Sequence, residues 1–119
     1  MTEARKWFRQ NFKADTNKIY TSKYYRPEES WPKTEVWWLQ FPLTAIENNK
    51  YDYVNFICQI FPGKNDFFYL KVPTEFLLKH LDKFHRIGEK VDIYLSAQPE
   101  NLFVELRGIG KLNFGRFLQ

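Results

Sequence analysis

The sequence holds few side chains that could perform a reaction, and their spacing does not favour catalysis. His80 and His85 are five residues apart, which would set them about 140° apart on a helix. Zinc ligands on one helix are normally three or four residues apart, so this pair does not predict a metal site. Cys58 lies in an apolar run without a neighbouring cation or histidine, which predicts a buried structural thiol. We therefore expect no bound metal and no cofactor.

Two further motifs have conformational rather than chemical interpretations. The segment Gly108-Ile109-Gly110-Lys111 lacks the full spacing and the terminal Ser or Thr of a phosphate-binding loop, so it predicts a turn. The adjacent carboxylates Glu28 and Glu29 lie in an expected loop and should point to solvent. Because no acid, base and nucleophile can be assigned together, the sequence favours a binding module over an enzyme.

The sharpest functional signal is a mixture of cations and aromatic rings in residues 5–26. This segment holds seven Lys or Arg residues, one acid and six aromatic residues, and the whole net charge of +4 arises within residues 1–33. Cations neutralise phosphates and aromatic rings stack on unpaired bases, so the mixture is typical of nucleic-acid surfaces. The opposite interpretation places Trp7, Phe8 and Phe12 in the core and leaves the cations on a solvated outer side.

A second candidate surface is the loop of residues 24–32, which carries large aromatic side chains beside both signs of charge. Exposed Tyr, Trp and Arg dominate binding hot spots because they offer large rigid contact areas. This loop predicts a protein partner or self-association, unless Trp31 fills one end of the core. The predicted residues for binding nucleic acid or a partner are Arg5, Arg9, Lys13, Lys18, Lys23, Tyr24, Tyr25, Arg26 and Trp31.

Three segments also carry a family resemblance. Lys18–Tyr25, with its Thr21-Ser22 pair, is followed by Val36–Pro42 and then by Tyr51–Val54. Over residues 15–84 this series resembles the second half of restriction-endonuclease-like proteins of the PD-(D/E)XK superfamily. In that superfamily a strand with the pattern Glu-x-Lys, often followed by Thr-Ser, supplies a metal ligand and a catalytic lysine.

The chain departs from that pattern at the site itself. Aligning Thr21-Ser22 puts Lys18 where the metal-binding acid should stand and Tyr20 where the lysine should stand, with Asp15 as the upstream acid. Metal-assisted hydrolysis needs carboxylates to hold the ion. The resemblance therefore implies a catalytically inactive relative that kept a nucleic-acid or partner surface. A metal-dependent nuclease is the enzymatic alternative.

Length and composition predict one globular domain. A chain of 119 residues can bury about two-thirds of its unfolded surface, so we expect a single domain over residues 1–119. Hydrophobic residues make up 44% of the chain, yet no apolar run reaches the roughly 18 residues needed to cross a membrane. The first residues lack the apolar core of a signal peptide, and one cysteine cannot form an internal disulfide. These features predict a reduced, cytoplasmic protein without a membrane partner.

Hydrophobic periodicity predicts the elements that position these residues. Helices are expected from Thr2 to about Lys13 and from Thr74 to Gly88, each with its Thr as N-cap, and Leu43–Asn48 is expected to form a helical turn. The second helix should bury Leu77, Leu78, Leu81 and Phe84. The expected strands are Lys18–Tyr25, Glu35–Phe41, Tyr53–Phe61, Phe67–Val72, Lys90–Ser96 and Leu102–Arg107.

The element order predicts the fold class. The third and fourth strands should form a hairpin at the centre of the sheet, and the last two a second hairpin that turns Leu102, Val104 and Leu106 inward. Pairs of strands separated by helices predict an α+β domain. We expect a mainly antiparallel or mixed sheet of about six strands with the N-terminal and central helices packed on it.

Overall fold

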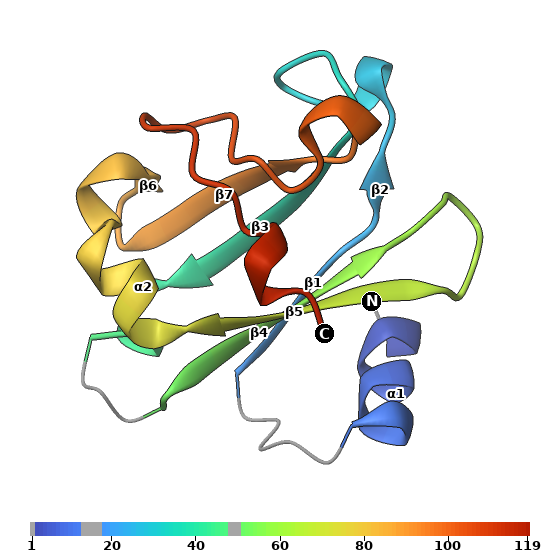
Figure 1. Ribbon diagram of the computed structural model, residues 1–119, viewed down its shortest axis with the longest axis horizontal. Helices are drawn as coiled ribbons and strands as arrows, with labels where there is room; N and C mark the ends of the chain where they lie inside the picture. The colour runs from blue at the N-terminus through green and yellow to red at the C-terminus, as the bar shows by residue number, and fades with distance from the viewer. Residues whose placement is uncertain (1, 13–17, 48–50) are drawn as a thin grey trace.

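The computed structural model describes residues 2–12, 18–47 and 51–119 and divides their strands between two sheets (Figure 1). The three-stranded sheet has the order β1 (Ile19–Ser22), β4 (Tyr53–Gln59), β5 (Phe67–Pro73). The four-stranded sheet has the order β2 (Tyr24–Tyr25), β3 (Val36–Pro42), β7 (Lys90–Ser96), β6 (His85–Ile87). The α-helices are α1 (Thr2–Asn11) and α2 (Thr74–Lys79). The predicted α+β class is confirmed.

The three-stranded sheet is covered on both sides. From one side of β4, Val54, Phe56 and Cys58 enter a core shared with the inner face of the four-stranded sheet. On the other side, Ile57 packs in a second cluster with Ala4 and Phe8 of α1. A strand that is buried on both faces explains the nearly continuous apolar run of β4. The layers are therefore α1, the three-stranded sheet and the four-stranded sheet, and the last has one face directed away from both other layers.

The hairpin predicted between the third and fourth strands is confirmed. β4 and β5 pair antiparallel with Tyr53 opposite Pro73 and Gln59 opposite Phe67. β4 is central in its sheet, with β1 parallel to it on the other side, whereas β5 is not central. The end of the chain runs beside β5, where the backbone N–H of Gln119 donates to the Tyr69 carbonyl at 2.9 Å.

The prediction of one strand over Lys18–Tyr25 is wrong in one respect, because the chain changes sheets at Lys23. β1 pairs with β4, whereas β2 pairs antiparallel with β3. At the break, the Ser22 hydroxyl donates to the Lys23 carbonyl at 2.7 Å and accepts the backbone N–H of Trp38 at 2.8 Å. The buried Ser22 hydroxyl thus satisfies backbone groups that have no partner strand at the point where the chain leaves the first sheet.

Helix α1 agrees with its predicted amphipathic pattern. Ala4 and Phe8 are fully buried against the three-stranded sheet, and the exposed cation Arg9 lies on the outer side. Trp7 and Phe12 are partly buried in the same cluster, which agrees with the interpretation that these rings belong to the core. The predicted helix end at Lys13 lies outside the described residues.

The helix predicted from Thr74 to Gly88 is much shorter in the structure. α2 ends at Lys79, a 3-10 turn covers Leu81–Lys83, and His85–Ile87 forms β6. Residues 85–87 pair with β7 and do not continue the helix, because Gly88 at φ +59° allows the tight turn that joins the two strands. Thr74 is also not the N-cap, and its buried hydroxyl oxygen has no hydrogen-bond partner.

The strand predicted over Leu102–Arg107, with its even-numbered residues inward, is wrong. The segment makes isolated bridges, Leu95 to Glu105 and Val104 to Asn113, and its most buried residues are Phe103 and Glu105, 2% and 1% exposed. Phe103 adopts φ +66°, outside the β region, which reverses the inward and outward positions. Of the other predicted elements, β7 has the predicted bounds, and β3 begins and ends one residue later than predicted. The turn predicted over Leu43–Asn48 is a 3-10 turn at Leu43–Ala45, and Asn48 lies outside the described residues.

Among the described residues, no helix combines the length and the apolar character that crossing a membrane requires.

Candidate ligand-binding surface

Four aromatic side chains form a row on the outer face of the four-stranded sheet. Trp38 of β3 is directly opposite Tyr94 of β7, with ring centroids 6.0 Å apart and planes 13° from parallel. Tyr25 of β2 flanks Trp38 at 6.2 Å, and Trp31, in the connection between β2 and β3, flanks Tyr94 at 6.1 Å. We call Tyr25, Trp38, Tyr94 and Trp31 the aromatic row. Antiparallel register places the three strand residues of the row on one side, because directly opposite residues point to the same side of a sheet.

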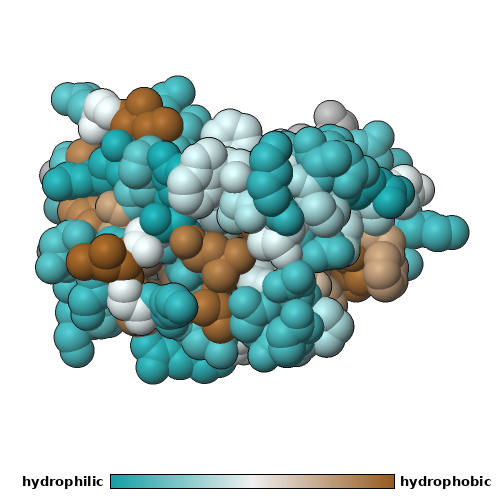
Figure 2. All heavy atoms as spheres, turned by 90° about the horizontal axis from the view of Figure 1, so that it is seen from above, coloured by the Kyte–Doolittle hydropathy of each residue, from teal (hydrophilic) through white to brown (hydrophobic). Residues whose placement is uncertain are grey.

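The aromatic row is accessible to solvent. Trp31 is 58% exposed and Trp38 36% exposed, while Tyr25 and Tyr94 are half-buried. The alternative that Trp31 fills one end of the core is therefore wrong. On the side of the molecule shown in Figure 2, strongly hydrophobic side chains form separate small patches among hydrophilic and near-neutral residues.

Two cations stack on the ends of the aromatic row. The guanidinium carbon of Arg107 lies 3.7 Å from the Trp31 ring centroid, and Lys23 Nζ lies 4.7 Å from that of Tyr25. Lys23 also makes a 2.8 Å ion pair with Glu29, whose hydrogen bond raises the pKa of Lys23 and lowers the pKa of Glu29. The second oxygen of Glu29 accepts the backbone N–H of Arg26 at 3.1 Å, which ties the loop to β2.

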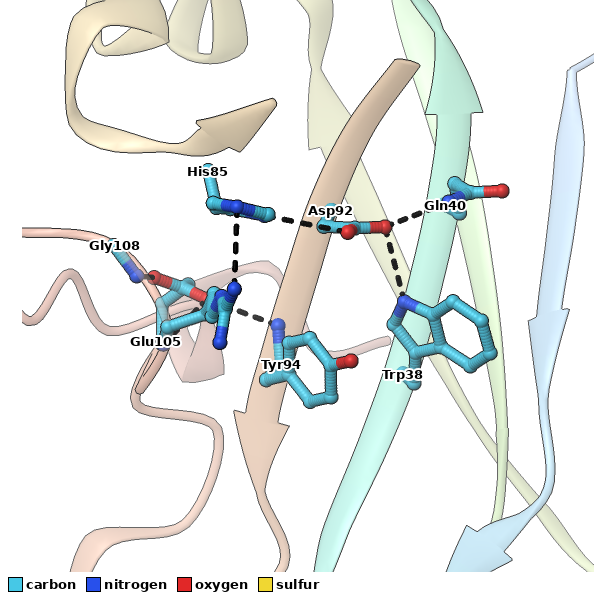
Figure 3. Close-up of polar contacts among 8 residues, drawn as sticks. Trp38, Gln40, His85, Asp92, Tyr94, Glu105 and Gly108 are labelled. Atoms are coloured by element: carbon cyan, nitrogen blue, oxygen red, sulfur yellow. Dashed lines mark hydrogen bonds and ion pairs between the residues drawn. The ribbon is translucent and has the colours of Figure 1, made fainter. Parts of the chain in front are cut away.

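A buried carboxylate beside the row, on the same face of the sheet, organises the neighbouring polar side chains (Figure 3). Asp92 is 2% exposed, and its Oδ1 accepts hydrogen bonds from Trp38 Nε1 at 3.1 Å and Gln40 Nε2 at 2.8 Å. Its Oδ2 lies 3.3 Å from His85 Nδ1. An ionised carboxylate only accepts, so each of these three side chains must present an N–H to Asp92. His85 is thereby oriented with Nε2 as the acceptor for Arg107 Nη2, 3.2 Å away.

A second buried carboxylate holds the segment that carries Arg107. Glu105 accepts the backbone N–H groups of Tyr94 at 2.9 Å, Arg107 at 3.1 Å and Gly108 at 2.7 Å. Burial raises the pKa of Glu105, whereas these three hydrogen bonds act in the opposite direction. A Cβ at Gly108 would lie 1.9 Å from the Lys83 carbonyl oxygen, so only glycine permits this close approach.

A cleft of about 390 Å³ opens beside Trp38. Its lining residues are Thr21, Ser22, Lys23, Tyr25, Trp38 and Gln40. Trp38 and Tyr25 supply aromatic walls, and Lys23 supplies a cation. Because Gln40 Nε2 is held by Asp92, the amide oxygen of Gln40 points away from that carboxylate (Figure 3). Volumes of roughly 300 to 1,000 Å³ are usual for small-molecule sites.

The structure brings together part of the predicted set of binding residues. Lys23, Tyr25 and Trp31 belong to the aromatic row or line its cleft, and Arg26 follows directly in the chain. Tyr24 points to the opposite side of β2, where its ring lies 6.3 Å from that of Trp37 in the core.

The remaining predicted residues lie elsewhere. Arg5 and Arg9 are on α1, at the three-stranded sheet, and Arg5 Nη2 donates to the Ile19 carbonyl at 3.0 Å. Lys18 Nζ lies 5.2 Å from the Tyr51 ring centroid. Lys13 lies outside the described residues.

Residues that sequence reasoning missed complete the surface. Trp38 and Gln40 are two positions apart in one predicted strand, and Asp92 and Tyr94 are two positions apart in another. The sequence therefore showed that the members of each pair share a face. The sequence did not show the strand register that places the two pairs opposite each other. Arg107 was assigned to a strand and had no signal linking it to Trp31.

The residues considered for metal or nucleophilic chemistry are separate in space. His80 Nδ1 lies 3.5 Å from Lys83 Nζ, whereas His85 contacts Asp92. Within residues 2–12, 18–47 and 51–119, no group of three or more His, Cys, Asp and Glu side chains is arranged to hold a metal ion. Asp15, the carboxylate on which the nuclease alternative depends, lies outside these ranges, and that alternative stays a prediction. Cys58 is fully buried, and burial raises the pKa of its thiol strongly.

Comparisons of this chain with protein families, with curated proteins and with solved structures found no match.

Proposed function

We propose that this protein binds single-stranded nucleic acid through the aromatic row. The observation that carries the proposal is the alignment of Trp31, Tyr94, Trp38 and Tyr25 on one accessible sheet face. Aromatic rings stack on unpaired bases at about 1 to 3 kcal/mol per base, and this requires bases that are not already stacked in a duplex. The proposal therefore specifies a single strand.

The cations of this face would contact the phosphates. Lys23 and Arg107 lie at the two ends of the row, and Arg26 is an exposed neighbour of Tyr25. If all three neutralise phosphates, counterion release predicts that a plot of log affinity against log salt has a slope of about −2 for a single strand. A slope of this moderate size would leave stacking to supply much of the affinity.

Fluorescence anisotropy of a labelled oligonucleotide of about a dozen nucleotides tests the proposal. We expect the single strand to bind more tightly than its duplex. Trp38→Ala should weaken binding roughly tenfold or more, since stacking on its ring is lost. Tyr53→Ala is the matched control, because Tyr53 is a 43% exposed aromatic residue of the other sheet.

Two results would refute the proposal. One is the absence of binding. The other is binding that survives Trp31→Ala and Trp38→Ala but is lost in the double variant Arg5→Gln and Arg9→Gln, which would place the site at α1. The protein-partner alternative predicts concentration-dependent self-association or complex formation that depends on Trp31, and sedimentation of the same variants measures it.

A further inference from the structure

The hydrogen-bonding polarity of the cleft is fixed by the residue directly opposite Gln40 on the neighbouring strand. Gln40 ends in both a donor and an acceptor, so an isolated glutamine has no preference for either partner. Here Asp92 determines which end of the amide faces it, because its buried Oδ1 lies 2.8 Å from Gln40 Nε2 and can only accept a hydrogen bond. Rotating the amide by 180° would set oxygen against oxygen. Gln40 Oε1 is therefore the atom that the amide directs away from Asp92 (Figure 3).

The side chain of Asp92 is held firmly enough to impose this choice. It also accepts Trp38 Nε1 at 3.1 Å and lies 3.3 Å from His85 Nδ1. Trp38 donates its single side-chain N–H to Asp92, so its ring contributes a stacking surface to the cleft but no hydrogen bond. Within the cleft, Gln40 thus offers an acceptor beside the Trp38 ring, and Lys23 offers donors.

We propose that this cleft selects cytosine or adenine, the two bases whose exocyclic amino group lies at pyrimidine C4 or purine C6. The inference rests on the proposed function, since it assigns a base preference to the same surface. The amino group would donate to Gln40 Oε1 while the base stacks on Trp38. Each of these bases has a ring nitrogen acceptor next to its amino group, which suits the ammonium of Lys23.

Uracil, thymine and hypoxanthine present a carbonyl oxygen where cytosine and adenine carry the amino group. In the pose described for cytosine and adenine, that oxygen would meet Gln40 Oε1, so the Gln40 acceptor would lose water without gaining a donor. A site built to bond one polar group rejects the analogue that lacks it, because its own group is left unpaired. The cleft should therefore discriminate between bases of almost the same shape.

Binding of matched homopolymers tests the inference with the unaltered protein. Oligocytidine is compared with oligouridine, and oligodeoxyadenosine with oligodeoxyinosine, by anisotropy at one salt concentration. We expect the amino-bearing member of each pair to bind about tenfold more tightly, which is the effect of one well-placed hydrogen bond. Equal affinities within both pairs, or a preference for the carbonyl-bearing members, would overturn the inference and leave the proposed function intact. Failure of all four to bind would refute the proposed function itself.

The variant Gln40→Met assigns the preference to the amide. Methionine keeps the length of the side chain but offers no comparable acceptor, so the affinity ratio within each pair should fall to about one while oligouridine still binds. Gln10→Met, at an exposed position of α1, is the control and should keep the ratio of the unaltered protein. If Gln40→Met keeps that ratio, Gln40 is not the selecting group. If that variant fails to fold, the homopolymer pairs alone still decide the question.

Discussion

The guanidinium of Arg107 joins the exposed Trp31 ring to the buried carboxylate of Asp92 through one intermediate side chain. Its central carbon lies 3.7 Å from the ring centroid, and its Nη2 lies 3.2 Å from Nε2 of His85, which contacts Asp92. A ring on a loop would otherwise be free to change rotamer. This chain of contacts fixes Trp31 at the end of the aromatic row, which lowers the entropy lost when a ligand binds.

Replacing Arg107 with lysine should weaken oligonucleotide binding by roughly three- to tenfold although the charge is kept. Lysine cannot reproduce a planar group that stacks on Trp31 and donates to His85 together. Anisotropy titration measures the affinity, and iodide quenching of tryptophan emission should increase as Trp31 is uncovered. Arg86→Lys, at an exposed position of β6, is the control. Unchanged affinity in Arg107→Lys would contradict a stacking role.

Asp92→Ala should lower the free energy of unfolding by about 2 to 4 kcal/mol. The substitution leaves the donors of Trp38 and Gln40 without their acceptor on this sheet face. Urea denaturation measures the change, with Asp82→Ala as the control at an exposed position. A loss no larger than that of the control would show that water satisfies these donors and that Asp92 does not order the face.

Glu105→Ala should have a comparable cost, about 2 to 4 kcal/mol, because three backbone N–H groups lose their acceptor at once. It should also release the segment that presents Arg107, so amide hydrogen exchange should accelerate at Arg107 and Gly108. Glu100→Ala, in the exposed turn before this segment, is the comparison. Exchange rates that match those of the unaltered protein would contradict the anchoring role.

The raised pKa of Tyr69 predicts that the protein loses stability in alkaline solution. Burial raises the pKa of its phenol from 10.0 to about 12, so the folded chain keeps a proton that the unfolded chain releases above pH 10. The contribution is complete below pH 10 and is lost as the pH rises towards 12, a change of about 2 to 3 kcal/mol. Tyr69→Phe should flatten this pH dependence relative to Tyr25→Phe.

The same substitution has a cost at neutral pH. Tyr69 donates to Asn55 Oδ1 at 2.6 Å, and Tyr69→Phe leaves that oxygen without its partner, at a cost of about 1 to 2 kcal/mol. Urea denaturation across the alkaline range separates the two effects. If the unfolding free energies of Tyr69→Phe and Tyr25→Phe fall equally between pH 10 and 12, the loss of stability belongs to other groups.

The sequence predicted the elements whose burial follows a simple period. In β3, Trp37 and Leu39 alternate with Trp38 and Gln40, so the strand and its two faces were both visible. The segment of Glu105 was assigned the wrong face, because the pattern places a charged residue outside. It does not show that three backbone donors and the close approach at Gly108 make burial of that carboxylate acceptable.

The candidate surface was predictable in part for the same reason. Tyr25 and Trp31 stood out by residue type in a short loop, and both belong to the aromatic row. Their partners Trp38 and Tyr94 come from strands more than 50 residues apart, as the separation of 54 residues between Trp38 and Asp92 illustrates. Composition and periodicity contain no information on that register, which depends on how the whole core packs.

The most direct test of the central claim is a nuclear magnetic resonance titration that follows the tryptophan indole N–H signals as a single-stranded oligonucleotide is added. Trp31 and Trp38 lie on the aromatic row, Trp37 is 1% exposed, and Trp7 packs at α1. We predict that the signals of Trp31 and Trp38 shift first and most, while those of Trp37 and Trp7 stay nearly constant. Shifts at Trp7 with no change at Trp31 and Trp38 would contradict the account.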